Sequence, residues 1–138
     1  MTAPVVLITG ALAGIGRATA LAFARQGARL VVSGRRDDAG QALVAELREL
    51  GAEAAFIRAD VRHEADVEGL VAGTLARFGR LDVAVNNAGT EGTLTPLTDL
   101  SLDAYAAVFD TNVLGTVLSL KHELRAMREQ GKIGRAHV

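Results

Sequence analysis

Short apolar runs alternate with amphipathic stretches along most of the chain. Strands are predicted where β-branched and other apolar residues cluster, at residues 5–9, 29–33, 54–58 and 83–86. Helices are predicted where apolar residues recur every three or four positions, at residues 14–26, 39–50, 64–78 and 102–128. A glycine follows each of the first three helices. Ser101 and Asp38 are the expected N-caps, the latter completing a capping box with Gln41.

This alternation predicts an α/β fold in which helices cover both faces of a parallel sheet. Right-handed crossovers give a doubly wound sheet with the strand order 3-2-1-4. No further strand is predicted after the last helix, which leaves the fourth strand as an unprotected edge. Ligands of such sheets bind beyond the carboxyl ends of the strands, here at the crevice between strands 1 and 4.

A glycine turn follows the first strand, with the sequence Thr9-Gly10-Ala11-Leu12-Ala13-Gly14-Ile15-Gly16. A strand, a glycine turn and a helix together bind phosphate, because the free N–H groups and the dipole of the first helical turn attract an anion. A Cβ in the turn would hold the backbone away from the phosphate. The spacing G-x-x-x-G-x-G differs from the usual dinucleotide fingerprint, and no Gly-Lys-Ser/Thr of an ATPase loop follows. The alternative is a purely structural turn.

The turn resembles the T-G-x-x-x-G-I-G signature of the short-chain dehydrogenase/reductase family. The segment Asn86-Asn87-Ala88-Gly89 resembles the N-N-A-G element of the same family, although an asparagine turn is the simpler interpretation. The resemblance implies a Rossmann-like dinucleotide-binding domain over residues 1–131. It further implies that the pyrophosphate binds at Gly10, Leu12, Ala13, Gly14, Ile15 and Gly16. The nicotinamide ribose is then expected beside Asn86, Asn87, Ala88 and Gly89.

Two further segments concern the adenosine end of the cofactor. In the family, an Asp after the third strand binds the adenine amino group. The resemblance assigns this role to Asp60, together with the backbone of Val61. The alternative interpretation is that Asp60 is simply an acidic residue that precedes the next helix. A dehydrogenase that prefers NAD carries an acid at the end of the second strand, where this chain has Gly34. Arg35 and Arg36 are therefore expected to pair with the 2′-phosphate of NADP, with NAD still possible.

The arginines have an alternative interpretation. They are also explained as solvated loop residues that Asp37 and Asp38 neutralise.

Asn112 is the one residue of the family's catalytic set that the chain contains. Asn has a poor helix propensity, so its presence among apolar neighbours in a predicted helix indicates a specific role. The resemblance implies that Asn112 kinks the helix and holds a water of the proton relay. The alternative is that Asn112 is an ordinary hydrogen-bonded polar residue on a solvent-exposed face of the helix. The family's Ser and Tyr-x-x-x-Lys are absent, and Tyr105 is followed four positions later by Phe109. We therefore expect the parent protein to oxidise alcohols or reduce carbonyls, and this chain to be inactive alone.

Two other function classes are weighed. The first is a non-catalytic NADP-binding module. The second is a different Rossmann enzyme such as a methyltransferase, whose glycine loop normally precedes an acid at the end of the second strand.

The last seven residues, 132–138, are expected to be a non-native tail. Family members continue with a Gly-x-Ile-Val-x-x-Ser-Ser strand, whereas this chain reads Lys-Ile-Gly-Arg-Ala-His-Val. The resemblance therefore implies a sheet that is truncated after the fourth strand and its following helix. One reading frame of a widely used sequencing adapter translates as Ile-Gly-Arg-Ala-His-Val and then stops. The tail is therefore interpreted as adapter sequence joined to a gene fragment.

Composition narrows the possible partners. A net charge of −1 gives no indication of nucleic acid or a lipid surface, and no apolar run has membrane-spanning length. No cysteine is present, which excludes thiolate metal sites and fits a cytoplasmic protein. His63, His122 and His137 lack ligand spacing and are expected at the surface, so no metal is predicted.

The last helix carries apolar residues on more than one side, at Val113, Leu114, Val117, Leu118 and Leu120. Either further residues of the chain or a second subunit cover these side chains, or all of them belong to one broad core-facing side of the helix. With the resemblance, this favours a homodimer or homotetramer for the full-length parent, acting on a small alcohol or carbonyl substrate.

Overall fold

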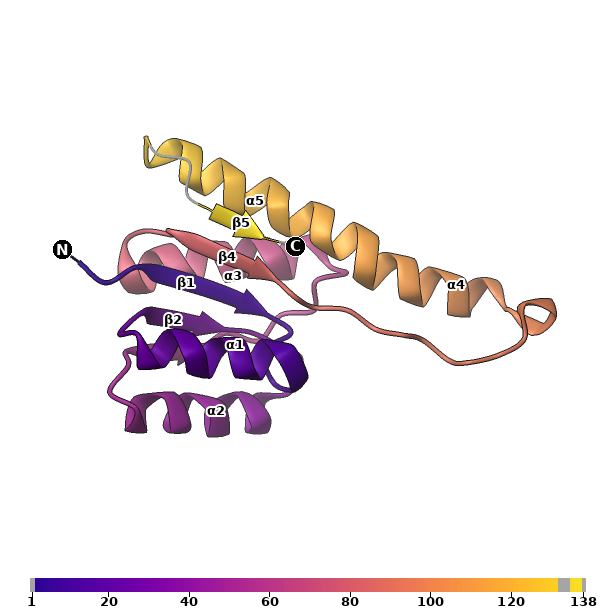
Figure 1. The fold of residues 1–138 in the computed structure, drawn as a ribbon. Helices are drawn as coiled ribbons and strands as arrows, with labels where there is room; N and C mark the ends of the chain where they lie inside the picture. Colours follow the sequence, from indigo (N-terminus) through magenta and orange to yellow (C-terminus); the bar gives the residue numbers. More distant parts are fainter. Residues whose placement is uncertain (1, 132–134, 138) are drawn as a thin grey trace.

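The computed structural model describes residues 2–131 and 135–137. Its parallel sheet has the order β3-β2-β1-β4-β5 (Figure 1). The strands are β1 (Val5–Thr9), β2 (Arg29–Val32), β3 (Ala54–Phe56), β4 (Val83–Asn86) and β5 (Arg135–His137). The helices are α1 (Gly14–Arg25), α2 (Asp37–Glu49), α3 (Glu64–Phe78), the short η1 (Leu97–Asp99), α4 (Leu102–Phe109), η2 (Asp110–Leu114) and α5 (Gly115–Glu129).

β1 lies at the centre of the sheet, and its sequence explains this place. Four consecutive residues, Val5 to Ile8, are fully buried, as expected of a strand that is covered on both faces. Ile8 lies beside Val32 of β2 and beside Val85 of β4. The predicted order 3-2-1-4 is therefore confirmed, and the switch point lies between β1 and β4.

Helices cover both faces of the sheet and create two cores. One core joins α1 and α2 to the sheet through residues such as Ala20, Ala24 and Leu47. The other joins α3 and α5 to the opposite face through Leu70, Val71 and Met127. Figure 1 shows α4 and the loop before it projecting past the carboxyl ends of the strands. No helix in the described part of the chain is both long and apolar enough to cross a membrane.

The sheet extends one strand beyond the expected truncation. β5 pairs in parallel with β4, with Arg135 beside Val83 and His137 beside Val85. The expectation that β4 forms an unprotected edge is therefore wrong. The unpaired N–H and C=O groups of a strand edge accept any extended segment that reaches them, and the tail is long enough to do so. Residues 132–134 and 138 of that tail lie outside the described residues.

Two local predictions for the helices need correction. α2 begins at Asp37, its N-cap is Arg36, and no side chain caps it, so the capping box of Asp38 is wrong. Both acids instead lie in the first turn, where they complement the helix dipole. The expected helix 102–128 is interrupted by a π-helical turn, η2. The Ser101 cap is confirmed, since its Oγ accepts the N–H of Ala104 at 3.1 Å.

Candidate functional site

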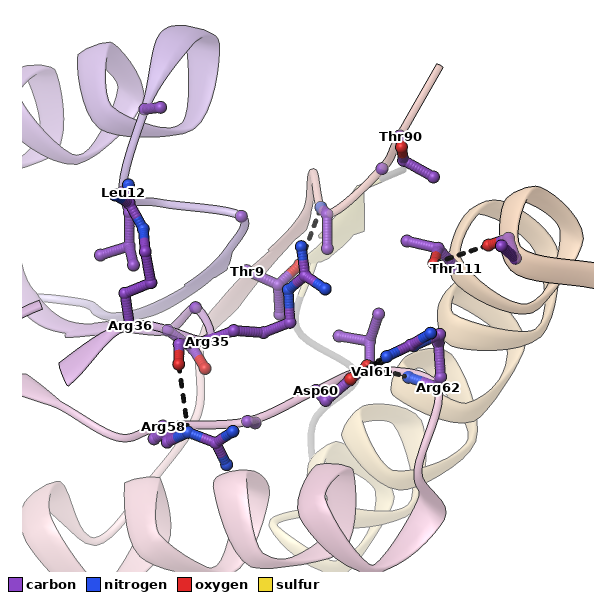
Figure 2. Close-up of a pocket in the computed structure, with 18 residues that line it drawn as sticks. Thr9, Leu12, Arg35, Arg36, Arg58, Asp60, Val61, Arg62, Thr90 and Thr111 are labelled. Carbon is purple, nitrogen blue, oxygen red and sulfur yellow. Dashed lines mark hydrogen bonds and ion pairs between the residues drawn. The ribbon is translucent and has the colours of Figure 1, made fainter. Parts of the chain in front are cut away.

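A cavity of about 660 Å³ opens at the carboxyl ends of β1 to β4 (Figure 2). It lies at the switch point between β1 and β4, where doubly wound sheets bind their ligands. The cavity brings together nine of the predicted site residues: Gly10, Leu12, Ala13, Arg35, Arg36, Asp60, Val61, Ala88 and Gly89. The other predicted residues do not line it: Gly14, Ile15, Gly16, Asn86, Asn87 and Asn112.

The glycine turn packs tightly against the segment that follows β4. Gly10 has φ +61°, and a Cβ on it would lie 2.8 Å from the backbone N of Ala88. A Cβ on Gly16 would overlap the carbonyl oxygen of Gly10 and approach the Asn87 amide. Glycine is therefore required at both positions, because the chain makes these contacts with its backbone.

The start of α1 offers its N–H groups to a ligand. Ala13 is the N-cap, its side chain caps nothing, and the first turn contains no acid. Ile15 is 78% exposed. The first-turn N–H groups of a helix lack intrahelical partners, so this end of α1 suits an anion.

Thr9 links the turn to the end of β4, a role that the sequence analysis missed. Its buried hydroxyl oxygen accepts the N–H groups of Asn87 and Ala88, both at 3.2 Å. The Asn87 side chain in turn donates to the carbonyl oxygen of Gly10 at 3.0 Å. The Thr that precedes the first glycine of the signature was the signal. These bonds hold the two walls of the cavity together.

Asn86 lies in the core rather than in the cavity. Its Nδ2 donates to Oε1 of Glu123, on α5, at 2.7 Å, and its Oδ1 has no partner in the described structure. Glu123 is only 1% exposed. Burial raises the pKa of Glu123 to about 7, and the bond from Asn86 opposes part of that rise. A lone acid among Ser119, Ala126 and Met127 on a buried helix face was the signal for this residue.

Asp60 is already engaged by a neighbouring arginine. The carboxylate accepts the backbone N–H of Arg62 at 3.1 Å and its Nη2 at 2.6 Å. The hydrogen bond from the Arg62 side chain lowers the pKa of Asp60 to about 2. Asp60 is therefore ionised at neutral pH and has acceptor oxygens at the cavity wall. Arg62, two residues after the acid, was not predicted.

The end of β2 places two arginines at the cavity. Figure 2 shows Arg35 reaching toward the middle of the cavity and Arg36 extending beside Leu12. Neither forms a salt bridge with Asp37 or Asp38 in the described part of the chain, so both guanidinium groups remain available. This disagrees with the alternative in which these acids neutralise them.

A hydrogen bond from Arg58 and the close approach of Leu12 to Gly34 shape the backbone at the end of β2. Arg58, which was not predicted, donates from Nε to the carbonyl oxygen of Arg35 at 3.1 Å. Position 34 is crowded, because a Cβ on Gly34 would lie 2.5 Å from Cδ1 of Leu12.

Asn112 lies in the π-helical turn η2 and holds the loop after β4. Its Oδ1 accepts the N–H of Thr90 at 2.8 Å, and its Nδ2 donates to the Thr90 carbonyl oxygen at 2.8 Å. The helix is irregular at this point, and such π-turns occur frequently at functional sites.

The histidines differ in part from expectation. His122 is buried between α3 and α5, and its Nε2 lies 2.8 Å from a carboxylate oxygen of Glu64, so the surface prediction is wrong for it. His63 is exposed, and the side chain of His137 lies outside the described residues. In the described part of the chain, no three His, Cys, Asp or Glu side chains come together as metal ligands.

Known proteins match this chain along nearly all of its length. The 2,5-dichloro-2,5-cyclohexadiene-1,4-diol dehydrogenase of Sphingobium indicum is 43% identical over 129 residues, covering 94% of this chain and 50% of that protein. The structure of an NAD+-bound xylitol dehydrogenase superposes with a TM-score of 0.92 at 37% identity, covering 96% of this chain and 51% of that one. The structure of an alcohol dehydrogenase from the archaeon Thermococcus sibiricus, complexed with 5-hydroxy-NADP, superposes with a TM-score of 0.90 at 36% identity. The match covers 98% of this chain and 57% of that one.

The chain spans about half the length of the relatives it matches. A family model described as short chain dehydrogenase matches residues 4–135. The match includes the glycine turn, the segment after β4 and the π-helical turn. The chain therefore belongs to the short-chain dehydrogenase family.

Proposed function

We propose that this chain is the cofactor-binding part of an oxidoreductase that transfers hydride between a nicotinamide dinucleotide and an alcohol or carbonyl substrate. The observation that carries the proposal is the glycine turn, which packs backbone to backbone against the segment after β4 and opens the start of α1 to an anion. When bound, the cofactor supplies the hydride, and the protein binds and orients it.

The described residues fit such a cofactor along the length of the cavity. The turn at Gly10, Leu12 and Ala13 suits the pyrophosphate, and the carboxylate of Asp60 suits the amino group of adenine. Ala88, Gly89 and Thr90 line the cavity and are the candidate wall for the nicotinamide ribose. They belong to the segment 86–90 (Asn86 to Thr90), whose end Asn112 holds in place.

The test is a titration of NADPH onto the purified chain, followed by the nicotinamide fluorescence. Saturable enhancement of the emission, displaced by 2′,5′-ADP, is the expected result. An emission that stays that of free NADPH, together with no heat of binding for 2′,5′-ADP, would overturn the proposal. We expect no oxidation of bound NADPH by carbonyl compounds, because Tyr105 stacks on Phe109 at 4.4 Å and has no lysine four residues on.

NADP is proposed in preference to NAD, because the end of β2 carries no acid and two arginines, Arg35 and Arg36, that form no salt bridge among the described residues. Arg35→Ala should weaken 2′,5′-ADP binding by roughly 10- to 100-fold, the value of one charge-assisted hydrogen bond, and leave 5′-ADP binding within about twofold. Isothermal titration calorimetry measures both. Arg25→Ala, the same loss of charge on the exposed end of α1, is the control. An equal loss for both nucleotides would contradict the preference.

A stripe of half-exposed apolar side chains runs along α4, η2 and α5. Tyr105, Phe109, Val113 and Val117 are each between 46% and 56% exposed. We propose that a second subunit covers this stripe in the full-length parent, as a homodimer or homotetramer. Light scattering of the parent measures its mass, and a monomer would contradict this.

The tail, residues 132–138, is proposed to be non-native, although part of it pairs as β5. Sequencing the genomic DNA beyond codon 131 tests this. The result expected is a different continuation that encodes Ser and Tyr-x-x-x-Lys. Intact genomic DNA that encodes the tail would refute it.

A further inference from the structure

The segment 86–90 is tied to one helical unit at both of its ends. At its far end, Asn112 bonds both backbone groups of Thr90. At its near end, Asn86 donates to Glu123, which lies three turns further along the same unit. Thr9 and Gly10 hold the residues between them. The helical unit therefore fixes where the candidate nicotinamide wall begins and where it ends.

A carboxyl group at position 123 is energetically unfavourable, because the position is buried. Transfer of a carboxyl group into a core costs free energy unless it is paired and hydrogen-bonded. Glu123 forms no salt bridge among the described residues, and the two residues before it, Lys121 and His122, bond Glu64 of α3 instead. Its one hydrogen-bond partner among the described side chains is Asn86. An apolar residue would pack at this position at a lower cost.

We propose that Glu123 is a positioning residue of the cofactor site: it accepts the side-chain N–H of Asn86 inside the core and so holds the start of segment 86–90 against the glycine turn. This rests on the proposed function, which makes that segment the wall for the nicotinamide half of the cofactor. Glu123 touches no ligand itself, since it lies on α5 and does not line the cavity. It acts through Asn86 and through the Asn87 amide that donates to Gly10.

The chemistry of the pair distinguishes two substitutions. Glu123→Gln keeps an acceptor for Nδ2 of Asn86 and adds an N–H that can donate to its partnerless Oδ1. Glu123→Leu has a similar size and leaves both polar atoms of the Asn86 amide without partners. The first substitution should preserve the position of segment 86–90, and the second should release it.

The experiment compares two ligands on each variant. NADPH reaches the whole cavity, whereas 2′,5′-ADP lacks the nicotinamide half. We expect Glu123→Leu to weaken NADPH about tenfold while 2′,5′-ADP changes less than about twofold, and Glu123→Gln to leave both within about twofold. Met127→Ala is the control, because it loosens the same contact between α5 and the sheet without touching Asn86. It should leave the ratio of the two dissociation constants unchanged.

Asn86→Ala provides a second approach if Glu123→Leu does not fold, which circular dichroism shows. Asn86→Ala removes the hydrogen-bond donor to Glu123 and should raise the ratio of the NADPH to the 2′,5′-ADP dissociation constant about tenfold. Combining it with Glu123→Gln should not raise this ratio further. A ratio that stays at the wild-type value in Glu123→Leu or Asn86→Ala overturns the proposal, as does a Glu123→Gln variant as impaired as Glu123→Leu. If the unmodified chain binds neither NADPH nor 2′,5′-ADP, the proposed function itself has failed.

Discussion

Gly16→Ala abolishes most of the cofactor binding that we propose for this chain, with an expected loss of NADPH affinity on the order of 100-fold. The added methyl group would overlap the carbonyl oxygen of Gly10 and the side-chain amide of Asn87, so the turn must open. Opening it moves the N–H groups at the start of α1 away from the pyrophosphate. Overpacking of this kind also costs roughly 1–3 kcal/mol of unfolding free energy. Fluorescence titration and urea denaturation measure the two effects.

Gly69→Ala is the matched control for this substitution. Gly69 lies inside α3, and a Cβ there meets nothing within 4 Å. Alanine has the higher helix propensity, so the control should stabilise the chain by up to about 1 kcal/mol and leave NADPH binding unchanged. A Gly16→Ala variant that binds as well as Gly69→Ala would show that the turn is not the pyrophosphate site.

Glu123→Gln should stabilise the chain above pH 7 and have little effect near pH 4. Burial raises the pKa of Glu123 from 4.5 to about 7 in the folded state. Between these two values the folded chain holds the proton that the unfolded chain releases, so this group lowers the free energy of unfolding as pH rises. Its contribution is fully favourable below pH 4.5, is lost progressively up to about pH 7 and stays constant above that. The shift corresponds to about 3 kcal/mol.

Urea denaturation of both proteins at several pH values measures this effect. The difference between Glu123→Gln and the unmodified chain should grow from pH 4.5 to 7 and then stay constant. Glu129→Gln, an exposed change on the same helix, should show no such growth. A difference that is the same at pH 4.5 and at pH 8 would mean that Glu123 titrates normally in the fold.

The strands and most helices follow from the sequence for identifiable reasons. β1 and β4 were predicted to the residue, because their apolar runs end at turn residues. α3 was also predicted to the residue, because its apolar stripe ends at Gly79, which adopts φ +79°. The start of α2 was placed two residues late, since the acids of its first turn look like caps. The strand β5 was missed because its pairing depends on an open edge rather than on its own sequence.

The candidate site was predicted unevenly. The residues at strand ends that line the cavity, such as Arg35, Asp60 and Ala88, follow from the topology together with the family resemblance. The roles of Thr9 and Glu123 depend on contacts between residues 78 and 37 positions apart. Such contacts exist only after the sheet has formed, so spacing along the chain could not indicate them. Gly16 was predicted as a phosphate ligand, whereas in the structure it also packs against Gly10 and Asn87.

The most direct test of the account is a nuclear magnetic resonance titration of the isotope-labelled chain with NADPH. Amide signals of the turn from Gly10 to Gly16, of Asp60 and Val61, and of the segment 86–90 should shift in a saturable way. Signals at the far end of α3, near Phe78, should stay in place. Binding that shifts signals elsewhere and leaves those of the turn unmoved would contradict the central claim that this turn binds the pyrophosphate of a nicotinamide cofactor.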